Sequence, residues 1–173
     1  MALERYTRTN QKIFYAGLSL DSWRKAEAAA SINAQALIQA EREAALFHLY
    51  GALLGLCHEI GGYYRLAEAD GAHVESILTP ALLQAAPSPE LAEMVELVQQ
   101  PETWLAQLLE AYNGLFEPLN APKKAKVAPG LPLIQAVSLD EEQVPLLAHT
   151  ELEAWRQQLK GLAQRFREAM VEW

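Results

Sequence analysis

The chain has 173 residues, of which 51% are hydrophobic and 21% are charged, a balance typical of a folded globular domain and not of a disordered chain. Its formal net charge of −8 argues against general nucleic-acid binding, because neutralising phosphates requires a basic surface. With a single cysteine, Cys57, the chain cannot form an intramolecular disulfide. Cys57 lies within an apolar run, so we expect a small buried hydrophobic side chain and not a reactive thiol.

The first residues, MALERYTRTNQK, carry early charges and lack the apolar segment that a secretory signal requires. The apolar run from Ala44 to Cys57 is shorter than a membrane span and is interrupted by His48. We therefore expect a cytoplasmic protein that does not insert into a membrane.

Hydrophobic periodicity predicts a first helix over residues 3–29 and a second over residues 31–66. Ser31 is a natural N-cap for the second helix. Because only a few residues join the two helices, we expect an antiparallel hairpin. Phe14 and Leu18 widen the apolar face of the first helix, whose main stripe comprises Ile13, Ala16, Leu20 and Trp23.

The second helix is expected to be the centre of the fold, because it has two neighbouring apolar seams and must be covered on more than one side. At 1.5 Å per residue it would be about 50 Å long. Gly51 and Gly55 lie inside it, and glycine there costs about 1 kcal/mol relative to alanine, which favours close approach of another helix. One seam comprises Leu46, Leu49, Leu53, Leu56, Ile60 and Tyr63, and the other comprises Phe47, Tyr50, Leu54, Cys57 and Tyr64.

Residues 67–87 read as a connection with short helical stretches. Ser88 and Pro89 then form a helix start signal, with serine as the cap and proline in the first turn. They predict a short helix over residues 90–100, which a proline ends, and a further helix follows over residues 102–116.

Residues 117–149 break the helical pattern with five prolines. A connection of this length is unusual in a compact domain. We expect its apolar part, residues 131–139, to lie against the bundle. Its basic cluster, a candidate partner site, comprises Lys123, Lys124 and Lys126.

Thr150 and Glu153 form a capping-box pattern that predicts the start of the last helix. The apolar stripe of this helix suits either an oligomer seam or the core face of an intramolecular bundle, and we favour the core face. Trp173 is a candidate anchor for a partner. The stripe comprises Leu152, Trp155, Leu159, Leu162, Phe166, Ala169 and Trp173.

The predicted fold is all-α, a single up-down helical bundle over residues 1–173 with four main helices. The helix over residues 90–100 is an addition to these four. The proline-rich residues 117–149 form a long crossover before the last helix.

On the second helix, Glu41, His48, Gly55 and Glu59 fall close to one line. His48, His58 and Glu59 are therefore candidate metal ligands. The two histidines lie too far apart along the helix to share an ion unaided, and the chain has no Glu-x-x-His motif. We expect a solvated polar face here, with no metal and no cofactor.

Arg42 and His48 enclose five residues, a spacing that resembles the Arg-x(4–6)-His signature of the HEPN superfamily, helical domains that include metal-independent ribonucleases. The resemblance implies that Arg42 and His48 form a catalytic pair that acts on RNA in a cleft between protomers. Glu43 stands where the active families usually have a small polar residue. The alternative is that Arg42 forms surface ion pairs with neighbouring glutamates.

Two segments, YTRTNQKIFYAGL at residues 6–18 and AQALIQAEREAALFHLYGALLGLCHEI at residues 34–60, resemble a family of small helical proteins of pseudomonad-type bacteria. That family is known only as a domain of unknown function, and the resemblance extends through the whole chain. It implies an all-helical cytoplasmic protein and carries no activity, ligand or site.

These observations favour a non-enzymatic helical interaction or scaffold module that self-associates or binds a protein partner. One alternative is a HEPN-like ribonuclease that uses Arg42 and His48. Another is a protein that binds an apolar small molecule between its helices.

Limited trypsin digestion of the folded protein is expected to cut first after Lys123, Lys124 or Lys126, because this stretch lacks helical periodicity and apolar anchors. The two fragments should stay associated, since the apolar stripe of the last helix holds it to the bundle. Mass spectrometry maps the first cut, and size-exclusion chromatography of the digest tests the association. A first cut at Arg42 would contradict this organisation.

Overall fold

The computed structural model describes residues 2–67, 69–117 and 147–171. Within these residues all regular structure is helical, so the predicted all-α class is confirmed. In chain order the helices are α1 (Ala2–Ala29), α2 (Ala34–Tyr64), α3 (Val74–Ile77), α4 (Pro80–Ala85), α5 (Pro89–Gln99), α6 (Trp104–Gly114) and α7 (His149–Val171).

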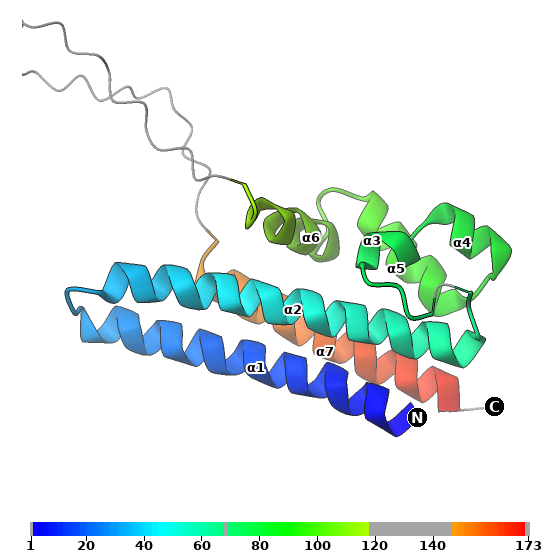
Figure 1. The fold of residues 1–173 in the computed structure, drawn as a ribbon, viewed down its shortest axis with the longest axis horizontal. Helices are drawn as coiled ribbons and strands as arrows, with labels where there is room; N and C mark the ends of the chain where they lie inside the picture. The colour runs from blue at the N-terminus through cyan, green and yellow to red at the C-terminus, as the bar shows by residue number, and fades with distance from the viewer. Residues whose placement is uncertain (1, 68, 118–146, 172–173) are drawn as a thin grey trace, which may run out of the picture.

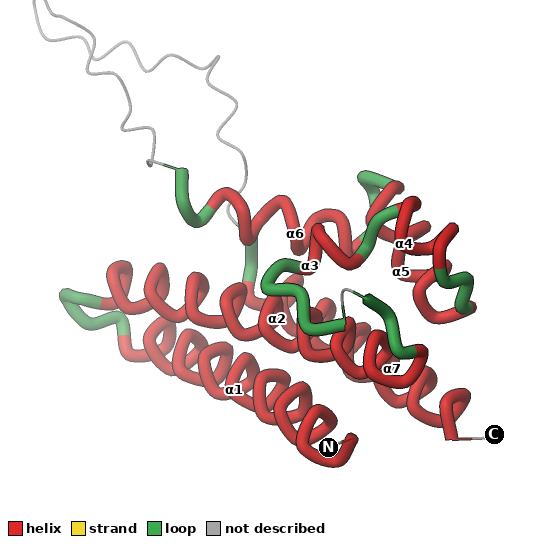
Figure 2. The backbone as a smooth tube through the Cα atoms, turned by 45° about the vertical axis from the view of Figure 1, so that its right-hand side comes forward, coloured by secondary structure: helices red, strands yellow, loops and turns green. Residues whose placement is uncertain are grey.

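The three long helices α1, α2 and α7 lie side by side, with α2 and α7 running in the same direction and α1 antiparallel to both (Figure 1). The shorter helices α3 to α6 gather on the side of α2 away from α1, and Figure 2 shows the same separation from a turned view. The predicted fourth main helix, α6, has 11 residues against the 31 of α2. This helix contacts α2, α5 and α7. Because it is short, it covers only part of the length of α2.

A tight turn joins α1 and α2, as the hairpin prediction requires. Ala30 has a φ of 45°, in the left-handed region, and reverses the chain after α1. The predicted cap, Ser31, is wrong by two residues, because its carbonyl oxygen accepts the Ala34 N–H within this turn and Asn33 takes the cap position. At the other end, Arg65 has a φ of 55° and its N–H closes α2 on the Gly61 carbonyl.

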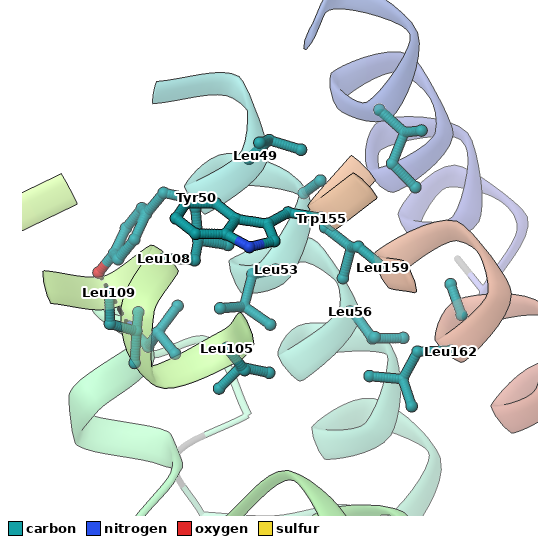
Figure 3. Packing of buried hydrophobic residues seen from close by; sticks show 14 of the residues in the cluster. Leu49, Tyr50, Leu53, Leu56, Leu105, Leu108, Leu109, Trp155, Leu159 and Leu162 are labelled. Carbon is teal, nitrogen blue, oxygen red and sulfur yellow. Dashed lines mark hydrogen bonds between the residues drawn. The ribbon is translucent and has the colours of Figure 1, made fainter. Parts of the chain in front are cut away.

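The core forms around α2, as its paired seams predict. Five of the six residues of the first seam are at most 3% exposed: Leu46, Leu49, Leu53, Leu56 and Ile60. Side chains of α6 and α7 pack against them, including Leu105, Leu108, Trp155 and Leu159 (Figure 3). Tyr63, the sixth residue, is 41% exposed and lies outside the core.

The second seam of α2 is covered only in part. Tyr50 and Cys57 are buried, and burial raises the pKa of the Cys57 thiol, which fits an inert core side chain. Phe47 is 52% exposed instead, contrary to the prediction. The reason is that the Tyr112 ring of α6 stacks on Tyr50 at 3.8 Å between centroids and reaches Phe47 only at 6.3 Å.

Two tyrosines of α2 hold the segment of short helices. The Tyr50 hydroxyl donates to Glu75 at 2.9 Å and accepts the Val74 N–H at 3.1 Å, at the start of α3. The Tyr64 hydroxyl donates to the buried Glu90 of α5 at 2.6 Å. These bonds satisfy polar groups that would otherwise be costly to bury.

The stripe of α7 is a core face and not an oligomer seam, because it is buried within one chain from Leu152 to Phe166. Ala169 is exposed and Met170 is buried in its place, since a straight helix drifts away from a strict seven-residue repeat. The predicted capping box is also wrong. The Glu151 carboxylate accepts the Ala148 N–H, and α7 begins one residue before Thr150.

Several predictions fall outside the described residues. They concern Trp173, the docking of residues 131–139, and the basic cluster of Lys123, Lys124 and Lys126.

Among the described residues, α2 is the one helix that is long and apolar enough to cross a membrane. In the bundle, 61% of the most apolar 18-residue stretch of α2 is buried inside the protein. The core helix of a soluble protein passes the same test of length and composition.

Replacing the fully buried Leu159 by alanine is expected to lower the free energy of unfolding by about 2–5 kcal/mol, because the substitution leaves a cavity between α2 and α7. Urea denaturation followed by circular dichroism measures the loss. The neighbouring Lys160 is exposed, so Lys160→Ala should change stability by no more than about 0.5 kcal/mol. Equal effects of the two substitutions would show that the α7 stripe is not core.

Candidate functional site

The expected solvated face of α2 is wrong, because this line of residues faces α1 and α7. Glu59 has no exposed side-chain surface and accepts two hydrogen bonds of 2.8 Å from Arg167 of α7. Arg167 also donates to Asn10 of α1 at 2.8 Å and lies 4.9 Å from the Tyr6 ring centroid. A buried, bidentate ion pair therefore connects all three long helices.

The rest of this line serves the α1–α2 contact. At Gly55 a Cβ would lie 2.6 Å from the Thr9 hydroxyl oxygen, so the position leaves no space for a side chain. Glu41 accepts a hydrogen bond of 2.8 Å from Ser22 of α1. Gly51 and Gly55 had indicated this close approach in the sequence, and together with the buried Ala45 and Ala52 they mark the face that meets α1.

The three candidate metal ligands do not converge. The His58 ring bonds the Gly71 carbonyl oxygen at 2.8 Å, while Glu59 is held by Arg167. His48 lies about 15 Å along the helix from His58, at 1.5 Å per residue. Within the part of the chain that the structure describes, no three His, Cys, Asp or Glu side chains cluster in a way that could hold a metal ion.

Arg42 and His48 point in different directions, about 120° apart around α2. The Arg42 guanidinium lies 4.8 Å from the Trp23 ring centroid, and its Nε donates to the Leu147 carbonyl at 3.2 Å. It also bonds the Gln39 side chain. Arg42 is therefore a partly buried link between α2 and Leu147, which precedes α7. Burial lowers the pKa of Arg42, while the charges of Glu27 and Glu43 raise it, so the attraction to neighbouring glutamates that the sequence suggested acts beside these contacts.

His48 instead lies against α1. Its ring meets Tyr15 edge-on at 5.4 Å between centroids, and its Nδ1 is buried without a hydrogen-bond partner. Burial lowers the pKa of His48, and the charges of Lys12 and Arg8 lower it further. The ring is therefore held in its neutral form near pH 7.

A groove between α1 and α7 forms a hollow of about 490 Å³. Phe14 and Leu18 line it and are 61% and 50% exposed, whereas the sequence had placed both on the apolar face of the bundle. A further hollow of about 310 Å³ continues from Phe14 and Arg156 toward Lys160. We call these two hollows together the α1–α7 groove.

Acidic and basic side chains alternate on both rims of the α1–α7 groove. Asp21 and Arg24 form an ion pair on the α1 rim, and Glu153 and Arg156 form a bidentate pair at 2.8 and 2.7 Å on the α7 rim. The pairs also attract one another across the groove. Arg156 lowers the pKa of Glu153 most and Arg24 lowers it further, while Asp21 helps Glu153 to raise the pKa of Arg156.

The whole chain, residues 1–173, matches the model of DUF6586, a family of unknown function. The protein belongs to this family. No curated protein and no solved structure matches the chain. Membership in DUF6586 agrees with the resemblance to a domain of unknown function and assigns no activity to any residue.

Removing one partner of the Glu59–Arg167 pair leaves the other charge buried and unpaired. Arg167→Met is therefore expected to lower the free energy of unfolding by about 3–5 kcal/mol, and adding Glu59→Leu should recover most of that loss. Arg165→Met is a matched control on the same helix, because it breaks an exposed pair with Glu93 and should cost about 1 kcal/mol or less. Equal losses in the two arginine variants, measured by urea denaturation, would refute a special role for the buried pair.

Proposed function

We propose that this DUF6586 protein is a non-enzymatic helical interaction module that self-associates through the α1–α7 groove. The observation that carries the proposal is the exposure of Phe14 and Leu18 one turn apart in a groove whose rims carry paired charges. Large apolar side chains grouped in a hollow with a polar rim are typical of protein interaction sites.

The arrangement of charges favours a second copy of the chain as the occupant. A two-fold axis parallel to the groove would set α1 of one copy over α7 of the other at matching levels. Asp21 would then meet Arg156 of the second copy, and Arg24 would meet Glu153. These are the same attractions that already act across the groove within one chain.

The two alternative functions have less support. A HEPN-like ribonuclease needs the Arg42 and His48 side chains in one cleft, but Arg42 is engaged by Trp23 and His48 by Tyr15. A site for an apolar small molecule needs an apolar cavity between helices, but charged side chains line the α1–α7 groove.

Replacing the two exposed apolar side chains tests the proposed interface. Sedimentation equilibrium over a range of concentrations is expected to show a dimer of the wild-type chain. The double variant Phe14→Ser/Leu18→Ser should raise its dissociation constant at least about tenfold, because burial of these side chains is lost in both copies. Ile32→Ser is the control, since Ile32 is fully exposed in the turn before α2 and does not line the groove.

Charge reversal tests the two-fold arrangement itself. Asp21→Arg alone and Arg156→Asp alone should each weaken self-association, because like charges then meet at both contacts. A mixture of the two variants should restore a heterodimer, in which both contacts pair opposite charges again. A wild-type chain that stays monomeric would refute self-association, and a dimer unaffected by Phe14→Ser/Leu18→Ser would place the interface elsewhere.

A further inference from the structure

A second exposed surface of α1 lies beside its contact with α2, on the side away from the α1–α7 groove. Arg5, Arg8 and Lys12 lie here on successive turns of α1. Glycines of α2 leave room for two of these side chains. A Cβ at Gly51 would lie 3.2 Å from Lys12 Cδ, and a Cβ at Gly62 would overlap the Arg5 guanidinium.

Two of these cations have no carboxylate partner among the described residues. Arg8 donates to the neutral side-chain oxygen of Gln11 at 2.6 Å, and Lys12 Nζ lies 5.3 Å from the Phe47 ring centroid. Burial lowers the pKa of Lys12, and the charge of Arg8 lowers it further. Arg5, the third cation, is already paired with the exposed carboxylate of Asp70 at 3.1 Å and donates to the His58 carbonyl oxygen at 2.7 Å. The positive charge that no described carboxylate pairs is therefore that of Arg8 and Lys12.

A hollow of about 210 Å³ opens beside the two arginines, lined by Glu4, Arg5, Arg8, Gly55 and His58. Gly55 contributes no side chain to fill it. Arg8 donates only to the neutral Gln11 oxygen, so its guanidinium is available for paired hydrogen bonds to a phosphate in this hollow. Arg5 lies three residues away on the same helix face and joins Arg8 at the phosphate by giving up its exposed partner, Asp70.

An exposed aromatic ring lies farther along the same face. Phe47 is 52% exposed and stands eight residues from Gly55 on α2, a separation of about 12 Å along the helix. That is close to the full length of an extended nucleoside monophosphate, from its phosphate oxygens to the far edge of its base. Lys12 lies between the hollow and the ring, over Phe47.

We propose that this face of α1 and α2 binds a small aromatic phosphate with the dimensions of a nucleoside monophosphate. The phosphate lies between Arg5 and Arg8, and the aromatic base lies against Phe47 beside Lys12. The negative charge of Glu4, on the rim of the hollow, repels the phosphate and weakens its binding. The site shares no lining residue with the α1–α7 groove, so it does not depend on self-association.

Isothermal titration calorimetry with three probes tests the site: AMP, inorganic phosphate and adenosine. AMP is expected to bind more tightly than either of the others, because only AMP offers both the phosphate and the ring. Arg8→Gln should weaken AMP binding about tenfold, the cost of one charge-assisted contact. Lys25→Gln removes an equal charge from an exposed position of α1 outside both sites and should leave AMP binding unchanged, whereas Glu4→Gln should strengthen it.

The pKa of His48 gives an independent readout by NMR, because Arg8 and Lys12 help to lower it. A phosphate bound at these cations should raise the pKa of His48, and adenosine should leave it unchanged. Circular dichroism confirms that each variant is folded. Three outcomes would overturn the proposal: AMP bound no more tightly than adenosine, phosphate bound as tightly as AMP, or equal AMP affinity in Arg8→Gln and the wild-type chain.

Discussion

The close packing of α1 on α2 is the constraint on which the rest of the structure depends. Gly55 leaves no space for a side chain beside the fully buried Thr9, and Ala45 and Ala52 are fully buried on the same side of α2. Because the two backbones lie this close, the main apolar stripe of α1 is buried against α2 and α7. Phe14 points away from α2, into the open α1–α7 groove, and therefore remains exposed although it is as apolar as the stripe.

The buried pair of Glu59 and Arg167 determines how α7 joins the hairpin. A buried charge is costly without its partner, so any other register of α7 on α2 would leave both side chains unsatisfied. Such a pair specifies one arrangement more than it adds net stability. This constraint matters here because α7 is separated from α6 by a long stretch of chain and its apolar stripe alone would tolerate a shift by one helical turn.

The two surfaces proposed as binding sites differ in how their charges are satisfied. Around Asp21 and Glu153 each acid already has a basic neighbour, so this part of the α1–α7 groove is near neutral and suits a second copy with the same alternation. Along the outer α1–α2 face, Arg8 and Lys12 have neutral partners and repel each other, which suits an anion. Paired charges thus favour a protein partner, and unpaired cations favour a small acidic ligand.

The sequence by itself determined the helical class, the order of the helices, the apolar seam of α2 and the stripe of α7, because these depend on periodicity and on proline positions that are local to each segment. The close α1–α2 approach could also be inferred, from Gly51 and Gly55. The sequence placed Phe14 and Phe47 in the core and Glu59 in solvent, and all three placements were wrong. A hydrophobic stripe shows which side of a helix is apolar, but it does not show how many neighbouring helices cover that side.

Only the tertiary structure decided those placements. α6 is too short to cover Phe47, α1 turns Phe14 outward, and α7 brings Arg167 to Glu59 from 108 residues away in the chain. The candidate binding surfaces arise in the same way, since each combines side chains of two helices whose relative rotation is set by packing. That rotation is a balance of close contacts, buried area and one ion pair across the whole bundle, and no local pattern of residues encodes it.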